Sequence, residues 1–428
     1  MFSQNGLSLD QAPPISVVFR FFFSGALFGI LAGILTLFFQ TTIFDAHSME
    51  AVTLTHTLTL GVMLSFMFAA LFQMLPVIAG VTLTSPVRKA DLVQYPFVLG
   101  VFTLLLAFNL STPWLFSIAS LLLGGSIFYI TIIMLKNLWG LPHHSSSSKG
   151  MLTALFSLGL VILLALYMTG TLAGIWEGNY YTQIKTAHYS FGLFGWIALL
   201  ILSISFQVIE MFYVTPSYPK LVSNYLPLTL LLLLVITSVL GLFNPDVWKV
   251  SNTLLALLLT GYALLTLKRL TQRKRPLTDA TVWFWRMGLG SLILSMFTMS
   301  MTLFTNLTIL KSFSYIFFAS FALSIVFAMF YKIVPFLTWF HLNSQGYFTA
   351  PMMHEVIHPK TAMKHLYIHL ATIVTFVLSL FVNVFIFLAG ILMILSFSWM
   401  AYQIVHANKL YKHTQETGEK FEMTIPQG

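Results

Sequence analysis

Residues 56–76 read HTLTLGVMLSFMFAALFQMLP, and this stretch decides the fold class. It contains no Asp, Glu, Lys or Arg. About 20 consecutive apolar residues form a helix long enough to cross the hydrocarbon core of a bilayer. The rest of the chain is similar, because 58% of its 428 residues are hydrophobic and only 8% are charged. A soluble domain has about 25% charged residues, so we predict an all-α integral membrane protein that is surrounded by lipid.

Apolar stretches of this kind recur about twelve times, which predicts one polytopic transmembrane domain over residues 1–428. We expect a segment 1–16 before the first span, a charged tail 408–428 after the last, and polar connections at 268–280 and 339–362. The expected spans are 17–40, 52–79, 94–110, 113–135, 151–172, 187–213, 224–243, 248–268, 281–305, 312–338, 363–382 and 384–407.

The basic residues predict the orientation. Of the 21 Lys and Arg residues, all but Lys185, Lys249 and Lys311 fall on one side of these spans. Cytoplasmic loops are enriched in Lys and Arg, so we expect both termini in the cytoplasm and a bacterial-type inner membrane. Arg20 and Arg286 are expected to anchor span ends at the interface. The net charge of +9 does not indicate nucleic-acid binding, because no soluble basic domain is present.

The chain has no cysteine. This excludes disulfides, thiolate metal sites, iron–sulfur clusters and covalent haem attachment through Cys-x-x-Cys-His. Any metal would therefore have to bind to His, Met, carboxylate or backbone oxygen.

Spans two, six and ten share a sequence plan, with a His or Tyr near the outer end and a Gln or Lys near the cytoplasmic end. About 17 residues of helix separate the two positions and cover roughly 26 Å. The pattern predicts a quasi-threefold arrangement of four-helix units, although amphiphilic helix ends recur in any polytopic protein. The residues are His56, Gln73 and Pro76 in span two, His188, Gln207 and Glu210 in span six, and Tyr315, Lys332 and Pro335 in span ten.

With these features the sequence resembles subunit I of the haem–copper oxidase superfamily. The resemblance covers most of the chain in topology, and its motifs are confined to spans two and six and the end of span ten. It implies that His56 corresponds to the histidine that binds the low-spin haem, and His188 to a histidine that binds copper. The cofactors it implies are haem b or copper, and the partners are a membrane subunit or a redox partner.

The sequence departs from this family at most other metal ligands. Span ten has no histidine between Lys311 and Trp339, and residues 221–241 lack the histidine pair of the family's helix 7. Gly192 stands where the family has a tyrosine four residues after the copper ligand. A complete oxygen-reducing centre is therefore not expected. In this respect the chain is similar to the NnrS-type membrane proteins linked to nitric oxide stress.

His56 and His188 are polar groups within apolar spans, where such groups are costly unless they are satisfied. We predict that they bind a metal or a haem. The alternatives are a proton relay, or hydrogen bonds that join neighbouring helices.

The polar residues of spans two, six and ten predict a polar pathway or a substrate cavity. The alternative is that Lys332 reaches the interface and pairs with Glu210. The residues in question are Gln73, Gln207, Glu210, Lys332 and Tyr315.

Residues 354–358 read HEVIH and match the zinc-protease pattern, in which two histidines on one helix face bind zinc and Glu activates water. Here the pattern falls in a predicted polar loop, and Pro359 disfavours helix at the residue before it. His365 and His369 are candidates for a further ligand. We interpret the segment as a polar loop, with metal binding and proteolysis as the alternatives.

Three functions follow from the sequence, and it does not decide whether the protein is an enzyme. The first is a divergent oxidase-like protein that binds haem b or copper in respiratory or nitrogen-oxide metabolism. The second is a transporter or channel with a pathway along spans two, six and ten. The third is a non-catalytic accessory or assembly subunit.

Overall fold

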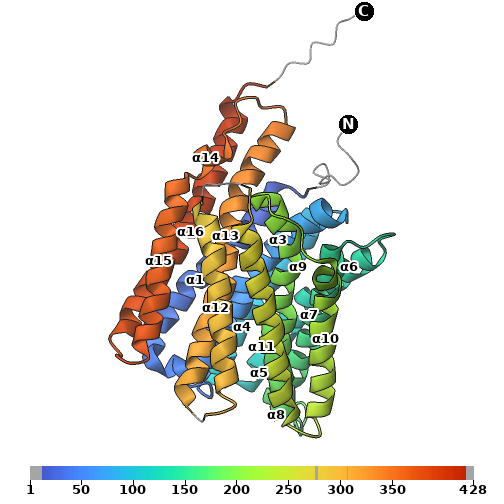
Figure 1. Cartoon of the computed structure of the whole chain (residues 1–428), viewed down its shortest axis with the longest axis vertical. Coiled ribbons are helices and arrows are strands. Elements are labelled where there is room, and N and C mark those ends of the chain that lie inside the picture. Colours follow the sequence, from blue (N-terminus) through green and yellow to red (C-terminus); the bar gives the residue numbers. More distant parts are fainter. Residues whose placement is uncertain (1–11, 275–277, 306, 421–428) are drawn as a thin grey trace, which may run out of the picture.

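The computed structural model describes residues 12–274, 278–305 and 307–420. Within these residues the chain is helical, and the only strand-like pairing is an isolated bridge between Tyr347 and Lys420. Twelve helical segments of the described chain are long and apolar enough to cross a membrane. They form one bundle (Figure 1), so the expected all-α polytopic fold is confirmed.

The twelve spans follow the predicted order. Spans two, four and six each contain a π-helical stretch between two α-helices, and the 3₁₀-helix η2 (Gln40–Phe44) and short α14 (Met353–Val356) lie in connections. The spans are α1 (Ile15–Phe39); α2 (Met49–His56), η3 (Thr57–Leu64) and α3 (Ser65–Ala79); α4 (Pro86–Leu110); α5 (Pro113–Ala119), η4 (Ser120–Gly124) and α6 (Gly125–Trp139); α7 (Ser146–Leu172); α8 (Tyr181–Ser190), η5 (Phe191–Ala198) and α9 (Leu199–Tyr213); α10 (Lys220–Gly241); α11 (Val247–Thr271); α12 (Ala280–Met301); α13 (Thr308–Ser344); α15 (Pro359–Ser379); and α16 (Phe385–Thr417).

The first and last spans pack side by side and run antiparallel. Glycines allow the close approach, because a Cβ built on Gly33 would lie 2.9 Å from the carbonyl oxygen of Gly390. Small residues let membrane helices pack with their backbones close together. The start of α1 and the end of α16 therefore lie at the same end of the bundle (Figure 1). We call this the basic end, because the described Lys and Arg residues lie at or toward it apart from Lys185, Lys249 and Lys311.

Two helices continue past their predicted boundaries at the basic end. Helix α13 runs to Ser344 instead of residue 338, and α16 runs to Thr417 instead of residue 407. The predicted tail 408–428 is therefore helical in its first part. In α16 polar residues end the apolar stretch but not the helix, because Lys, Gln and Glu are good helix formers. The α13 extension, residues 339–344, mixes apolar Trp, Phe and Leu with His, Asn and Ser. Helix α1 begins at Ile15, and residues 1–11 and 421–428 of the predicted terminal segments lie outside the described residues.

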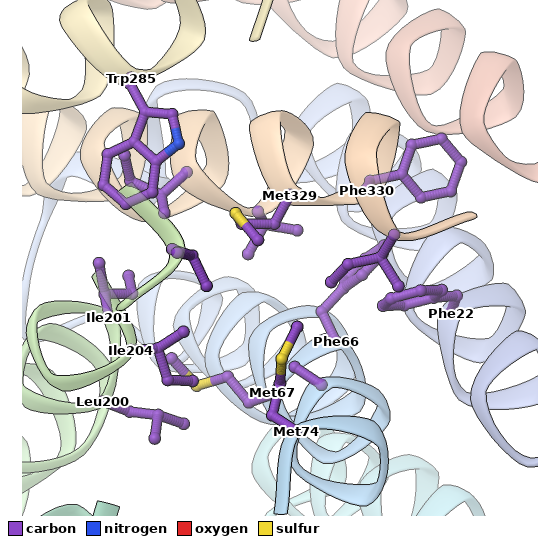
Figure 2. A pocket seen from close by; sticks show the side chains of 15 residues that line it. Phe22, Phe66, Met67, Met74, Leu200, Ile201, Ile204, Trp285, Met329 and Phe330 are labelled. Atoms are coloured by element: carbon purple, nitrogen blue, oxygen red, sulfur yellow. The ribbon is translucent and has the colours of Figure 1, made fainter. Parts of the chain in front are cut away.

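Spans two and six are the inner helices of the bundle. In their most apolar windows 83% and 78% of the residues are buried, against 33–56% in the other ten spans. Helix α13 joins them, and the three spans surround a cavity of about 60 Å³ lined almost entirely by apolar side chains (Figure 2). The cavity is lined by Phe66, Met67 and Met74 from span two, Leu200, Ile201 and Ile204 from span six, and Ile325, Met329 and Phe330 from α13, among others. Spans two, six and ten therefore all contribute to the wall of one cavity, together with Phe22 of α1 and Trp285 of α12.

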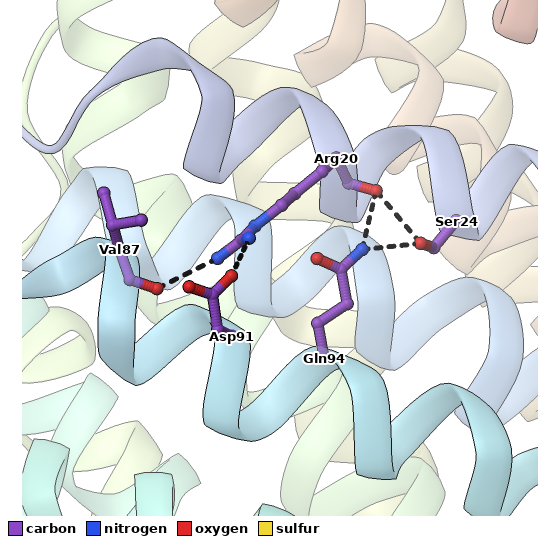
Figure 3. Close-up of polar contacts among 5 residues, drawn as sticks. All are labelled: Arg20, Ser24, Val87, Asp91 and Gln94. Atoms are coloured by element: carbon purple, nitrogen blue, oxygen red, sulfur yellow. Dashed lines mark hydrogen bonds and ion pairs between the residues drawn. The ribbon is translucent and has the colours of Figure 1, made fainter.

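Arg20 joins the first and third spans near the basic end (Figure 3). Its guanidinium forms an ion pair with Asp91 and donates to the carbonyl oxygen of Val87. One turn further along α4, the Gln94 amide donates to the Arg20 carbonyl oxygen at 3.0 Å and to Ser24 Oγ at 2.7 Å. The prediction that Arg20 is only an interfacial anchor is therefore wrong, since its partner is a carboxylate on a neighbouring helix.

Candidate functional site

Spans two and six change to π-helical geometry directly after their histidine positions. Stretches η3 and η5 are both eight residues long. They start at residues 57 and 191, and Gln73 and Gln207 follow at the same offset of 134 residues. This common offset supports the predicted relationship between the two spans. Helix α13 remains α-helical throughout, so the third copy lacks the stretch.

π-Helical turns are rare and occur frequently at functional sites. Stretch η4 in span four shows that a π-helical stretch alone does not identify a site in this chain. What distinguishes spans two and six is that a histidine stands close before each stretch, His56 at the end of α2 and His188 within α8.

The structure brings these two histidines together at the end of the bundle opposite the basic end. The centres of the His56 and His188 rings are 6.3 Å apart, and their planes differ by 14°. Both side chains are partly buried, and Phe108 of α4 packs against the His56 ring at 5.0 Å. Two residues that are 132 positions apart in the sequence therefore form one pair.

Each histidine is oriented by a backbone carbonyl. His56 Nδ1 donates to the carbonyl oxygen of Val52 at 2.8 Å, and His188 Nδ1 donates to that of Val161 at 3.3 Å. A carbonyl oxygen only accepts, so in the neutral ring the proton is on Nδ1 and Nε2 keeps its lone pair. Metal-binding histidines are commonly fixed in this way by the nitrogen that does not bind the metal.

The distance between the rings suits one metal ion between them. Two imidazole nitrogens, each about 2 Å from a shared metal ion, place their ring centres at most about 6 Å apart. The 6.3 Å separation lies at this limit, so one ion fits between the rings once both Nε2 atoms are turned toward it. Among the described residues no group of three or more His, Asp or Glu side chains is placed to hold a metal, so further ligands would have to come from water, Met or backbone.

The predicted polar residues of spans two, six and ten do not form one continuous path. Tyr315 lies near the end with the histidines and is half exposed. Gln73 and Lys332 line a cavity of about 280 Å³ at the basic end. Gln207 and Glu210 are partly buried on α9 and do not line that cavity.

Lys332 pairs with Asp279 and not with Glu210, so the alternative pairing predicted from the sequence is wrong. The Lys332 ammonium lies 2.6 Å from Asp279 Oδ2 and 5.4 Å from the centre of the Tyr213 ring. Glu210 instead accepts a hydrogen bond from the backbone N–H of Tyr218 at 3.2 Å. The reason is that α12, which begins directly after Asp279, packs along α13.

Asp279 has two further roles as a charged acceptor. It caps α12 by accepting from the Val282 N–H at 3.1 Å, and it accepts from Thr281 Oγ1 at 2.6 Å. Burial alone would raise the pKa of Asp279, but the adjacent Lys332 ammonium and these hydrogen bonds outweigh it and lower the pKa below 3.8. The carboxylate is therefore ionised at neutral pH.

The HEVIH segment does not have the geometry of a zinc protease. Helix α14 ends at Val356, and Ile357 is extended, so His354 and His358 do not share a helix face. Glu355 accepts from the Met352 N–H at 2.7 Å, and His358 Nδ1 accepts from the Lys360 N–H at 3.1 Å. The segment acts in capping two helices, in agreement with the interpretation as a polar connection.

His365 and His369 are in the core and not at the interface where the sequence places them. Both are buried on α15 and pack against the Phe327 ring at 4.7 and 4.8 Å. His365 bonds to Tyr331 Oη at 3.0 Å and to Ser396 Oγ at 2.7 Å, whereas His369 bonds to Ser324 Oγ at 3.0 Å. They join α13, α15 and α16 and do not supplement the HEVIH segment. In the sequence, the spacing of four between the two histidines, with Thr372 one turn later on the same helix face, could have indicated that this face is buried.

The chain matches no known family model and no curated protein.

Proposed function

We propose that this multi-pass membrane protein binds one copper ion between His56 and His188. The observation that supports this most directly is the pair of nearly parallel imidazoles, 6.3 Å apart, whose Nδ1 atoms are both held by backbone carbonyls. Imidazole nitrogen suits copper, and copper binds most strongly among the divalent first-row metals. A bound copper ion would supply one-electron redox chemistry, in line with a role in respiratory or nitrogen-oxide metabolism.

Haem b is the other cofactor implied by the resemblance to the haem–copper oxidases. An iron atom between the two Nε2 atoms would need the same separation of the rings. However, the Phe108 ring already packs 5.0 Å from the His56 ring and competes for the space that a flat macrocycle needs. We therefore favour a copper ion over a haem at this pair.

The test is copper binding by the purified protein. The full chain in detergent is titrated with Cu(I) against a chromogenic chelator, and its optical spectrum is recorded beforehand for a Soret band. We expect one equivalent of tightly bound copper, which His56→Ala and His188→Ala each abolish. His47→Ala is the matched control, because His47 is an exposed histidine in the connection just before α2. Equal copper binding by all four proteins would refute the proposal. A Soret band that is lost in both His56→Ala and His188→Ala would show that the pair binds haem and not copper.

One observation supports transport as a second candidate function. The two cavities share Met74 and Ile333 as lining residues, so they lie end to end between the inner spans. A pathway here would begin at Gln73 and Lys332 and would not include Gln207 or Glu210. Flux into proteoliposomes that is reduced by Gln73→Leu but not by Gln207→Leu would support transport over a redox function.

A further inference from the structure

The larger cavity lies where the inner spans reach the basic end. It has a volume of about 280 Å³, which is roughly nine times the 30 Å³ share of one liquid water molecule. Its walls are mostly apolar and include Met74 and Val77 from α3, Phe212 from α9 and Phe336 from α13. Met353 of α14 also lines it and is half exposed, so one wall is at the protein surface.

Gln73 is the buried polar group of this cavity. Its side chain is only 3% exposed, and its Oε1 atom has no hydrogen-bond partner. A buried carboxamide oxygen without a partner is unfavourable, because it has lost its bonds to water and gained none. The oxygen has almost no surface on the cavity, but the carboxamide offers both an acceptor and donors. A half-turn of the amide exchanges Oε1 and Nε2 and would present the oxygen to a ligand hydroxyl in the cavity.

Lys332 adds donors to the cavity but no net charge. One of its three N–H groups points to Asp279 Oδ2 at 2.6 Å, which leaves two for a ligand. Because the Lys332–Asp279 pair is neutral overall, the cavity has no uncompensated positive charge that would select an anion. The chemistry of the site therefore favours a neutral polar group attached to an apolar body.

We propose that this cavity binds a neutral amphiphile of about ten non-hydrogen atoms, with an apolar or aromatic body and a hydroxyl group. The hydroxyl donates to Gln73 Oε1, and its oxygen accepts from Lys332 Nζ. The apolar body packs among the Met, Val and Phe side chains that line the walls. The inference does not depend on copper binding at the opposite end of the bundle.

The test compares 1-naphthol with naphthalene, which has the same body without the hydroxyl. Binding to the full chain is measured by equilibrium dialysis in identical micelles, so that partition into detergent cancels between variants. We expect 1-naphthol to bind more tightly than naphthalene. Gln73→Leu weakens 1-naphthol binding by about 3- to 10-fold, the value of one hydrogen bond, and leaves naphthalene binding unchanged.

Two further variants complete the design. Gln207→Leu is the matched control, because Gln207 stands at the equivalent position of span six and does not line the cavity. This variant should change the binding of neither ligand. Val77→Phe fills part of the cavity and should weaken both ligands, with size-exclusion and thermal unfolding as checks on the fold. Equal binding of the two ligands to the wild type, or no effect of Gln73→Leu, would show that Gln73 recognises no hydroxyl group and would overturn the proposal.

Discussion

Replacing Asp279 removes a helix cap and an ion pair at once, and the structure separates the two. Loss of the cap on α12 costs about 0.5–2 kcal/mol. The ion pair contributes about 0–1 kcal/mol, because the Asp279 side chain is 42% exposed and water screens it. We therefore expect Asp279→Ala to lose about 0.5–3 kcal/mol of unfolding free energy. Asp279→Asn keeps an N-cap of equal quality and should lose at most about 1 kcal/mol.

The contribution of the Asp279–Lys332 ion pair to the unfolding free energy also depends on pH in a defined direction. Burial acts to raise the pKa of Asp279, but Lys332 and the hydrogen bonds outweigh it, so the folded pKa lies below the unfolded one. A depressed carboxyl pKa stabilises the fold fully above the unfolded pKa of about 3.9, and this stabilisation is lost as the pH falls through the folded pKa. The difference between wild type and Asp279→Asn should therefore be constant from pH 7 to about pH 5, begin to shrink near pH 4, and disappear only once the pH is below the lowered folded pKa.

The assay is unfolding in mixed micelles of a mild detergent with increasing dodecyl sulfate, followed by circular dichroism. Lys332→Met removes the same ion pair from the other side and serves as the control. If Asp279→Asn proves as destabilising as Asp279→Ala, the cap is not formed. If the gap to the wild type widens on acidification, the sign of the pKa shift is wrong.

Two other predictions use the same assay. In Gly33→Val the new side chain would collide with the carbonyl oxygen of Gly390, and the unfolding free energy should fall by about 1–3 kcal/mol or more. Gly159→Val is the control and should change the unfolding free energy little, because a Cβ there meets nothing within 4 Å. Equal unfolding of the two variants would contradict the close packing of α1 on α16. Arg20→Met leaves Asp91 without its partner and should lose about 1–2 kcal/mol. Adding Asp91→Asn to Arg20→Met should lower the unfolding free energy less than Asp91→Asn does in the wild type. If the two losses of unfolding free energy simply add, the ion pair contributes nothing.

The spans were predictable because hydropathy and helix length are local properties. The extension of α16 was missed because the residues after 407 are mainly polar, and polarity ends a membrane span without ending a helix. The extension of α13 was missed because its residues 339–344 mix apolar and polar types and fall in the predicted polar connection 339–362. The register shared by spans two and six was visible in Gln73 and Gln207. The π-helical stretches that accompany it were not, because a wider helical turn has no distinct residue pattern.

The candidate sites were predictable residue by residue but not in their contacts. His56 and His188 stand out as isolated polar groups in apolar sequence, whereas their 6.3 Å separation depends on how spans two and six pack. The partner of Lys332 was misassigned because Asp279 lies in a connection that the sequence does not place beside α13. His365 and His369 were placed at an interface because hydropathy does not show which face of α15 is buried.

The contact between α1 and α16 has a consequence for biosynthesis. The first helix to enter the membrane finds its glycine-lined partner only in the last one, more than 350 residues later in the chain. Until α16 is inserted, the flat surface around Gly33 is covered by lipid alone. A product that stops before Phe385 therefore leaves this surface of α1 without its helical partner.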